Sequence, residues 1–266
     1  MSERESYEHG IPSWVDHSSP DPEGAAHFYG ALLGWETEDQ MPPDQPGQYF
    51  MCRLRGRDVA ATGSQQAPDA PPMWNTYIAV DSADDAAAAI RDAGGTVLGE
   101  PFDVFDAGRM AVALDPEGTP FCIWQAQRTP GAGIVNEPGA LCWTELTARD
   151  PDTAKAFYGS VFGWRSGPMA PDDPYTLWYA AGGGDPGGDD PPIGGLMPLG
   201  GDPSGQPPNW AVCFAVADTD ATAASCTELG GGTIMAPFDT PVGRTAVLAD
   251  PQGAGFAVIA LSDPGQ

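Results

Sequence analysis

Residues 14–35 read WVDHSSPDPEGAAHFYGALLGW, and residues 143–164 read WTELTARDPDTAKAFYGSVFGW, a match at an offset of 129 residues. A second pair of similar segments, 74–103 and 210–239, follows at an offset of 136 residues. Similar segments that recur in the same order indicate a duplicated structural unit. The chain of 266 residues is therefore predicted to contain two copies of one unit, each of about 130 residues.

Each copy predicts a helix early in the unit. Asp21 and Asp150 each precede a proline, which is typical of a helix N-terminus, because the carboxylate caps free N–H groups and proline fits the first turn. Gly34 and Gly163 then provide the stop. The apolar residues between them share one helical face: Phe28, Tyr29, Leu32 and Leu33 in the first copy, and Phe157, Tyr158, Val161 and Phe162 in the second.

A short strand with alternating faces precedes each helix. Trp14, Asp16 and Ser18 lie on one face, and Val15 and His17 lie on the other, so His17 is expected to face the helix. The second copy places Trp143, Glu145 and Thr147 on the equivalent face.

Further strands and an alanine-rich helix complete each copy. The fold class is predicted to be α+β, with four βαβββ modules paired into two domains with cupped mixed sheets. Proline-rich stretches at 67–72, 128–138 and 200–208 separate the modules, and the glycine-rich stretch 182–188 is expected to be a loop. The predicted organisation is an N-terminal tail (1–10), a first domain (11–127, modules 11–66 and 73–126), a linker (128–139) and a second domain (140–261, modules 140–199 and 209–261).

The order of these elements resembles a known superfamily. A strand, a helix containing Phe-Tyr and followed by Gly-Trp, and later Asp-Pro-x-Gly (115–118 and 250–253) resemble the vicinal-oxygen-chelate superfamily of glyoxalases, bleomycin-resistance proteins and dioxygenases. The resemblance covers nearly the whole chain and is closest to two-copy, glyoxalase-like actinobacterial proteins. It implies two glyoxalase-like domains, and a divalent metal held by His, Glu or Gln.

The positions where the superfamily places its metal ligands carry other residues here. Because metal centres need several convergent nitrogen or oxygen ligands, neither a metal site nor another cofactor is predicted. The three positions correspond to Trp14, Asn75 and Cys122 in the first copy, and to Trp143, Ala211 and Ala257 in the second.

Aromatic residues gather near these positions instead. Tryptophan offers a large flat surface and one N–H donor, which suits an aromatic ligand. For Trp14 and Trp143, ligand contact and core packing both remain open. Cys122 has no histidine placed to activate it, so an inert thiol is favoured over a nucleophile. The candidate ligand-binding residues are Trp14, Trp74, Asn75, Tyr77, Cys122, Trp124, Trp143, Trp178, Trp210, Arg109 and Arg244.

Asp16 and Glu145 are the candidate catalytic residues. A carboxylate on an inner sheet face costs free energy unless it has a partner, and burial raises its pKa, which suits a general base. The alternative is that Asp16 and Glu145 form structural ion pairs with Arg109 and Arg244, which are also equivalent in the repeat.

Charge and cysteine content limit the possible partners. The net charge of −26 disfavours nucleic acid and membrane surfaces. Five scattered cysteines without a C-x-x-C motif disfavour a disulfide framework, and the N-terminal sequence lacks the apolar core of a signal peptide, so a cytoplasmic location is expected. The chain is expected to be a monomer, as a fused pseudo-dimer.

The sequence is compatible with three functions. The first is a metal-independent protein that binds a bulky aromatic natural product or antibiotic, for resistance, sequestration or biosynthesis. The second is a metal-independent enzyme, such as a cyclase, a lyase or a hydroxylase accessory, with Asp16 or Glu145 as base. The third is glyoxalase-like detoxification of methylglyoxal. The first copy's pocket is the more polar, since Asn75 and Cys122 correspond to alanines in the second copy, and it is favoured if one site acts alone.

Overall fold

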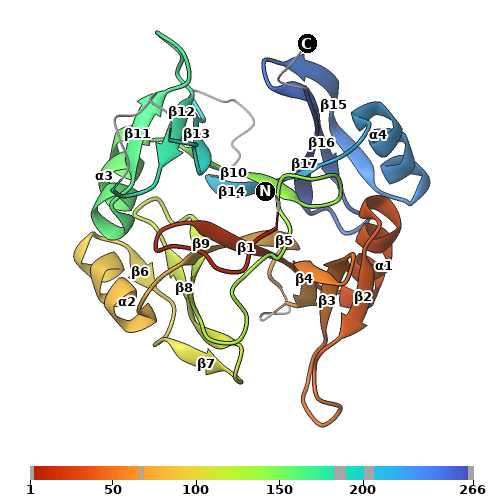
Figure 1. The fold of residues 1–266 in the computed structure, drawn as a ribbon, viewed down its shortest axis with the longest axis horizontal. Coiled ribbons are helices and arrows are strands. Elements are labelled where there is room, and N and C mark those ends of the chain that lie inside the picture. The colour runs from red at the N-terminus through yellow and green to blue at the C-terminus, as the bar shows by residue number, and fades with distance from the viewer. Residues whose placement is uncertain (1–2, 66, 68, 183–189, 201–206, 263–266) are drawn as a thin grey trace.

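The computed structural model describes residues 3–65, 67, 69–182, 190–200 and 207–262. The predicted glycine-rich loop at 182–188 and the connection at 200–208 fall mostly outside the described residues. Within the described part, two curled mixed sheets and four helices form the molecule (Figure 1). No helix in that part is long and apolar enough to cross a membrane.

The first sheet combines the first two modules. Its described strands run in the order β2-β3-β4-β1-β5-β9-β8-β6, and β7 also pairs with β8. The elements are β1 (Pro12–Ser19), α1 (Pro22–Leu33), β2 (Glu36–Asp39), β3 (Tyr49–Leu54), β4 (Arg57–Ser64), β5 (Met73–Ala79), α2 (Ala83–Asp92), β6 (Thr96–Val97), β7 (Phe102–Val104), β8 (Gly108–Leu114) and β9 (Pro120–Ala126).

The second sheet repeats this arrangement in the order β11-β12-β13-β10-β14-β17-β16-β15. The prediction of an α+β fold with four βαβββ modules is therefore confirmed. The elements are β10 (Leu141–Ala148), α3 (Pro151–Phe162), β11 (Arg165–Pro168), β12 (Thr176–Tyr179), β13 (Gly194–Pro198), β14 (Asn209–Ala215), α4 (Thr219–Glu228), β15 (Gly232–Thr240), β16 (Gly243–Ala249) and β17 (Gly255–Leu261).

The ends of α1 and α3 follow from the repeated sequence. The carboxylate of Asp21 accepts the N–H of Gly24, and that of Asp150 accepts the N–H of Thr153. Each helix ends at a glycine in the left-handed region, Gly34 at φ 77° and Gly163 at φ 69°, a conformation that costs glycine little.

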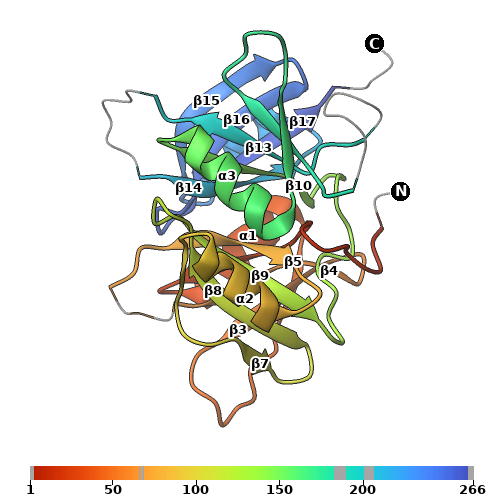
Figure 2. The same cartoon turned by 90° about the vertical axis from the view of Figure 1, so that its left-hand side faces the viewer.

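The helices lie at the two flanks of the molecule and pack in pairs. Helices α1 and α4 are neighbours on one side of the molecule, and α2 and α3 are neighbours on the other (Figures 1 and 2). In α1, Phe28 and Tyr29 share a buried core with Phe256 of the second sheet. In α3, Phe157 shares another with Phe121 of the first sheet. Each half of the chain therefore supplies part of the other half's core.

Two tryptophans that follow these helices each form a hydrogen bond to the other half of the chain. The indole N–H of Trp35 donates to the carbonyl of Gly139, and that of Trp164 donates to the carbonyl of Gly10, at 2.6 and 2.7 Å. Gly10 and Gly139 are buried residues just before the first strand of each sheet. The two halves are thus held in a pseudo-twofold arrangement.

Candidate functional site

The helix-free face of the first sheet gathers polar and aromatic side chains. Strands β1 and β5 are antiparallel, with Trp14 opposite Tyr77 and Asp16 opposite Asn75, and β9 adds Cys122 beside Tyr77. We call this surface the first inner face, defined by Trp14, Asp16, Tyr49, Asn75, Tyr77, Cys122 and Trp124.

Asp16 is the centre of the first inner face. It is buried, and it accepts hydrogen bonds from the Asn75 amide at 2.8 Å and from the hydroxyls of Tyr77 and Tyr49 at 2.7 and 3.1 Å. Burial raises the pKa of Asp16, although the three donors oppose that effect. The Tyr49 hydroxyl also accepts the indole N–H of Trp14 at 3.3 Å. A Trp14–Tyr49–Asp16 relay therefore lies across the sheet.

The second sheet contains the same relay from equivalent residues. The indole N–H of Trp143 donates to the Tyr175 hydroxyl at 2.9 Å, and that hydroxyl lies next to the carboxylate of Glu145. Burial raises the pKa of Glu145, and the bond from Tyr175 opposes the rise. We call this surface the second inner face, defined by Cys142, Trp143, Glu145, Tyr175, Ala211, Cys213 and Ala257.

The two tyrosines were not among the predicted site residues. Tyr49 begins β3 and Tyr175 immediately precedes β12, and the match between these two segments of the repeat is the signal that could have identified them. Their role depends on how β3 and β12 align with β1 and β10, which the residues of one strand do not specify. The sequence therefore located both carboxylates and two of the donors to Asp16, Asn75 and Tyr77, but it missed Tyr49 and Tyr175.

The two inner faces differ in their accessibility. On the first face, Trp14, Tyr77, Cys122 and Trp124 are buried together with Asp16. The segment after β9 helps to cover this face, since the Trp124 indole donates to the carbonyl of Thr129 and Ala132 packs on the same cluster. On the second face, all seven defining residues are half-buried. The second face, rather than the first, is therefore the one open to a ligand.

Three predicted ligand-binding tryptophans lie on the opposite, helix-facing sides of the sheets. The indole N–H of Trp74 donates to the Tyr29 hydroxyl at 3.0 Å, and that of Trp210 donates to the Tyr158 hydroxyl at 2.9 Å. Trp178 is fully buried and packs on Tyr158. The structure therefore places Trp74, Trp178 and Trp210 in the shared cores and does not bring them to either inner face.

Arg109 and Arg244 do not meet the inner carboxylates, so the predicted alternative of structural ion pairs with Asp16 and Glu145 is wrong. Arg109 binds both carboxylate oxygens of Asp84, in the first turn of α2, and also reaches Asp103. Asp84 and Asp220 lie in the first turns of α2 and α4, where the helix dipole stabilises a negative charge. The arginines pair with these surface carboxylates instead of the inner ones. Arg244 pairs likewise with Asp220 of α4 and with Asp239.

His17 faces the helices, as predicted. Its imidazole Nε2 lies 3.1 Å from a carboxylate oxygen of Asp250, and both side chains are fully buried. The hydroxyl of Tyr29 donates to the same oxygen of Asp250 at 3.2 Å. In the other half, the Tyr158 hydroxyl donates to Asp115, but Leu146 takes the place of the histidine.

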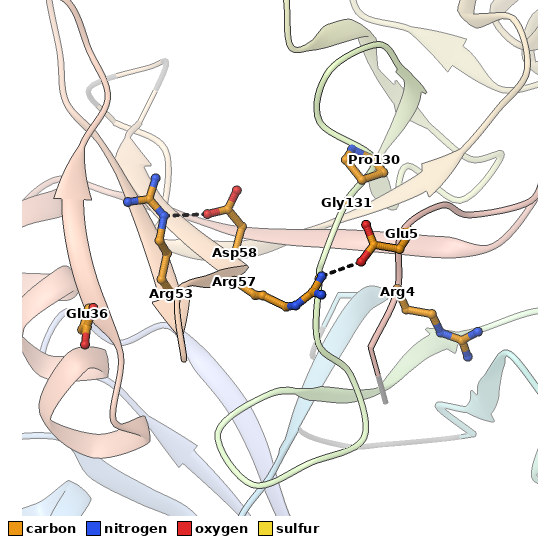
Figure 3. A pocket seen from close by; sticks show the side chains of 10 residues that line it. Arg4, Glu5, Glu36, Arg53, Arg57, Asp58, Pro130 and Gly131 are labelled. Carbon is orange, nitrogen blue, oxygen red and sulfur yellow. Dashed lines mark hydrogen bonds and ion pairs between the residues drawn. The ribbon is translucent and has the colours of Figure 1, made fainter. Parts of the chain in front are cut away.

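One hollow lies away from both inner faces. It is an open groove of about 600 Å³, in which Arg57 pairs with Glu5 and Arg53 pairs with Asp58 (Figure 3). Its charges are therefore largely paired within the protein. The lining residues are Arg4, Glu5, Glu36, Arg53, Gly56, Arg57, Asp58, Pro130, Gly131 and Gly133.

The donor set of the inner faces does not fit the superfamily's divalent metal. Asp16 is the one carboxylate on the first inner face, and its oxygens are already engaged by three protein donors. Glu145 has no second carboxylate or histidine beside it on the second inner face. Across the described residues, no group of three or more His, Cys, Asp or Glu side chains is placed to hold a metal ion.

Comparison with known proteins assigns the family from the sequence. The model of the glyoxalase-like domain matches residues 14–124 and 143–259. The chain belongs to this glyoxalase-like family. It is 43% identical over 267 residues to the putative glyoxylase CFP32 of Mycobacterium tuberculosis, covering 97% of this chain and 98% of the relative. It is 35% identical over 271 residues to the anthracycline biosynthesis protein DnrV of Streptomyces peucetius, with coverage of 96% and 94%.

Solved structures share the glyoxalase-like fold. The Mn(II)-bound glyoxalase of Novosphingobium aromaticivorans superposes with a TM-score of 0.62 at 15% identity, covering 96% of this chain and 85% of that one. The 2,3-dioxygenase LapB of Pseudomonas sp. KL28 gives a TM-score of 0.63 at 15% identity, with coverage of 97% and 96%. These structures show the same fold, and the match of the family model over both halves of the chain confirms the predicted resemblance.

Proposed function

We propose that this protein binds a flat aromatic small molecule on the second inner face. The observation that carries the proposal is the arrangement of Trp143, Tyr175 and Glu145, all of which are half-buried, whereas Trp14 and Asp16 at the equivalent positions are buried. In this site the indole of Trp143 stacks on the ligand, and Glu145 accepts a hydrogen bond from a ligand hydroxyl or ammonium.

The relay prepares both groups for binding. Because the N–H of Trp143 is bonded to Tyr175, the indole is oriented before the ligand arrives, which lowers the entropy lost on binding. The positions equivalent to Asn75 and Tyr77, which both bond Asp16, are Ala211 and Cys213 in the second sheet. The carboxylate of Glu145 can therefore accept hydrogen bonds from a ligand, whereas the carboxylate of Asp16 already accepts three from the protein.

Two relatives agree with an aromatic ligand. DnrV and DauV are anthracycline biosynthesis proteins, and anthracyclines are flat polycyclic aromatics with several hydroxyl groups. A ligand of that chemical class offers a face for Trp143 and donors for Glu145. An antibiotic-binding or biosynthetic role, like the cytoplasmic location and the monomeric state, remains a prediction.

A second function is favoured by the raised pKa of Glu145. A carboxylate with a raised pKa is a stronger base, so Glu145 could remove a proton from the bound ligand. The protein would then be a metal-independent enzyme rather than a binder. Mass spectrometry of the recovered ligand separates the two, because a binder returns it unchanged.

The test is calorimetric titration with a panel of hydroxylated anthraquinones. Replacing Glu145→Gln removes a charge-assisted hydrogen bond of about 1.5–3 kcal/mol, so affinity is expected to fall roughly 10- to 100-fold. Trp143→Leu is expected to weaken binding similarly. The matched control on the other sheet is Asp16→Asn, which should leave affinity within about twofold. Loss of binding in the control with full binding by Glu145→Gln would place the site on the first inner face instead.

A further inference from the structure

Two cysteines lie opposite each other on strands β10 and β14. The pairing register of these antiparallel strands shifts between Leu141 and Trp143, so that Cys142 and Trp143 both stand against Cys213. Such a shift is a β-bulge, in which two residues of one strand face one residue of the other. Residues that face each other across antiparallel strands have Cα atoms roughly 4.5–5.5 Å apart, within the range of about 4.4–6.8 Å seen for disulfides.

Cys142 and Cys213 are in direct contact. The thiol of Cys142 donates a hydrogen bond to the backbone carbonyl of Cys213 at 3.3 Å, and the Cys142 side chain raises the pKa of the Cys213 thiol. Both are free thiols and both are half-buried, which leaves them open to small solutes. The other three cysteines, Cys52, Cys122 and Cys226, are buried.

The first sheet lacks this arrangement at the equivalent positions. There Ser13 precedes Trp14 in the same bulge, and Tyr77 stands opposite. The dithiol is therefore a feature of the second inner face alone. The packing common to the two sheets does not require it, since the first sheet forms the same bulge without any cysteine.

We propose that Cys142 and Cys213 are a redox modification site, which hydrogen peroxide converts into a reversible disulfide on the second inner face. One thiolate attacks a peroxide oxygen, the O–O bond breaks, and water leaves with a sulfenic acid on the first cysteine. The second thiol then attacks that sulfur and displaces a second water. The two thiols lose two electrons in total, and the peroxide gains them.

Contact with Cys142, then burial, then the charges of Cys142 and Glu145 raise the pKa of the Cys213 thiol. The disulfide is the same product whichever of the two thiols attacks the peroxide first, because the other then attacks the sulfenic acid. This site does not depend on the identity of any bound ligand.

The experiment treats the folded, full-length protein with a small excess of hydrogen peroxide, blocks the remaining thiols and maps the unreduced peptides. Two of the five free thiols are expected to be lost, a peptide linked through Cys142 and Cys213 should appear, and dithiothreitol should restore both thiols. Cys142→Ser and Cys213→Ser should each form no linked peptide. Cys122→Ser, on the first inner face, should form it as the parent does.

Two results would overturn the proposal. One is that all five thiols persist in the folded protein at peroxide levels that oxidise a free cysteine peptide. The other is that the linked peptides join a different pair, or that Cys142 proceeds to sulfinic acid without any link to Cys213. Because the wild-type map alone decides between these outcomes, the test does not rely on the folding of the serine variants.

Discussion

Asp16 and Glu145 occupy equivalent positions but have different surroundings. Three donors surround Asp16, and a buried polar group left without its partner costs about 1–3 kcal/mol. Glu145 is half-exposed, so water can replace a lost partner there. The carboxylate at this position therefore stabilises the first sheet, whereas in the second sheet it stays accessible to solvent.

Removing each carboxylate should show this difference. Asp16→Ala is expected to lower the free energy of unfolding by about 3 kcal/mol, because Asn75, Tyr77 and Tyr49 lose their common acceptor. Glu145→Ala is expected to lower it by less than about 1 kcal/mol. Urea unfolding of both variants measures the difference, and equal losses would contradict the contrast drawn between the two faces.

The buried pair of His17 and Asp250 predicts a pH effect. Burial alone would raise the pKa of Asp250, but the bond and charge of His17 outweigh it and leave the pKa lowered. A carboxylate whose pKa is lowered by folding stabilises the protein fully above its unfolded pKa of about 3.9, and that contribution is lost as the pH falls through the folded value. Asp115, with Leu146 instead of a histidine nearby, has a raised pKa, so its contribution has the opposite sign.

His17→Leu copies the arrangement of the other half. At pH 6 the variant is expected to be less stable than the parent by about 3–5 kcal/mol, because one partner of a buried pair is removed. The difference should shrink as the pH falls below about 4, where Asp250 begins to be protonated. Urea unfolding between pH 6 and pH 3 tests this, and a difference that is constant over the range would show that Asp250 is not the responsible group.

The helices were predictable because their signals are local. Asp21 and Asp150 cap them and Gly34 and Gly163 end them, so a single segment contains the information. Strand alternation placed Asp16 on the inner face. The same alternation places Trp74 on the helix-facing side, because Trp74 is next to Asn75 along β5 and Asn75 lies opposite Asp16. The predicted set of ligand-binding residues did not take this into account. The partner of Arg109 could not be predicted, because it depends on where the start of α2 lies in space.

The reciprocal bonds that follow α1 and α3 give a matched pair of tests. Trp35→Phe and Trp164→Phe keep most of the apolar surface but leave the buried carbonyls of Gly139 and Gly10 without their donors. Each variant is expected to lose about 1–3 kcal/mol of unfolding free energy. Chemical denaturation should give similar values for both, and a loss confined to one would contradict the pseudo-twofold arrangement.

Across the whole molecule, the shared cores connect the two halves. One core contains Phe28 of the first half and Phe256 of the second, and the other contains Phe121 and Phe157 in the reverse sense. Neither sheet keeps its packing when the other is removed. The net charge of −26 opposes compactness, so this packing must also overcome self-repulsion.

Thermal unfolding should accordingly be a single transition in calorimetry, with equal calorimetric and van't Hoff enthalpies. Cleavage at an engineered protease site near Glu137, after folding, should leave the two fragments associated on a sizing column. Two resolved transitions, or fragments that separate without denaturant, would show that the halves are independent.

The reciprocal cores also matter for how the gene can change. In a symmetric homodimer every substitution occurs in both subunits, so the two inner faces must carry the same residues. Fusion of the copies removes that constraint while keeping the paired packing. His17 against Leu146, and Tyr77 against Cys213, are differences that a single-copy gene could not encode. The two halves can therefore differ at these positions while the paired packing is kept.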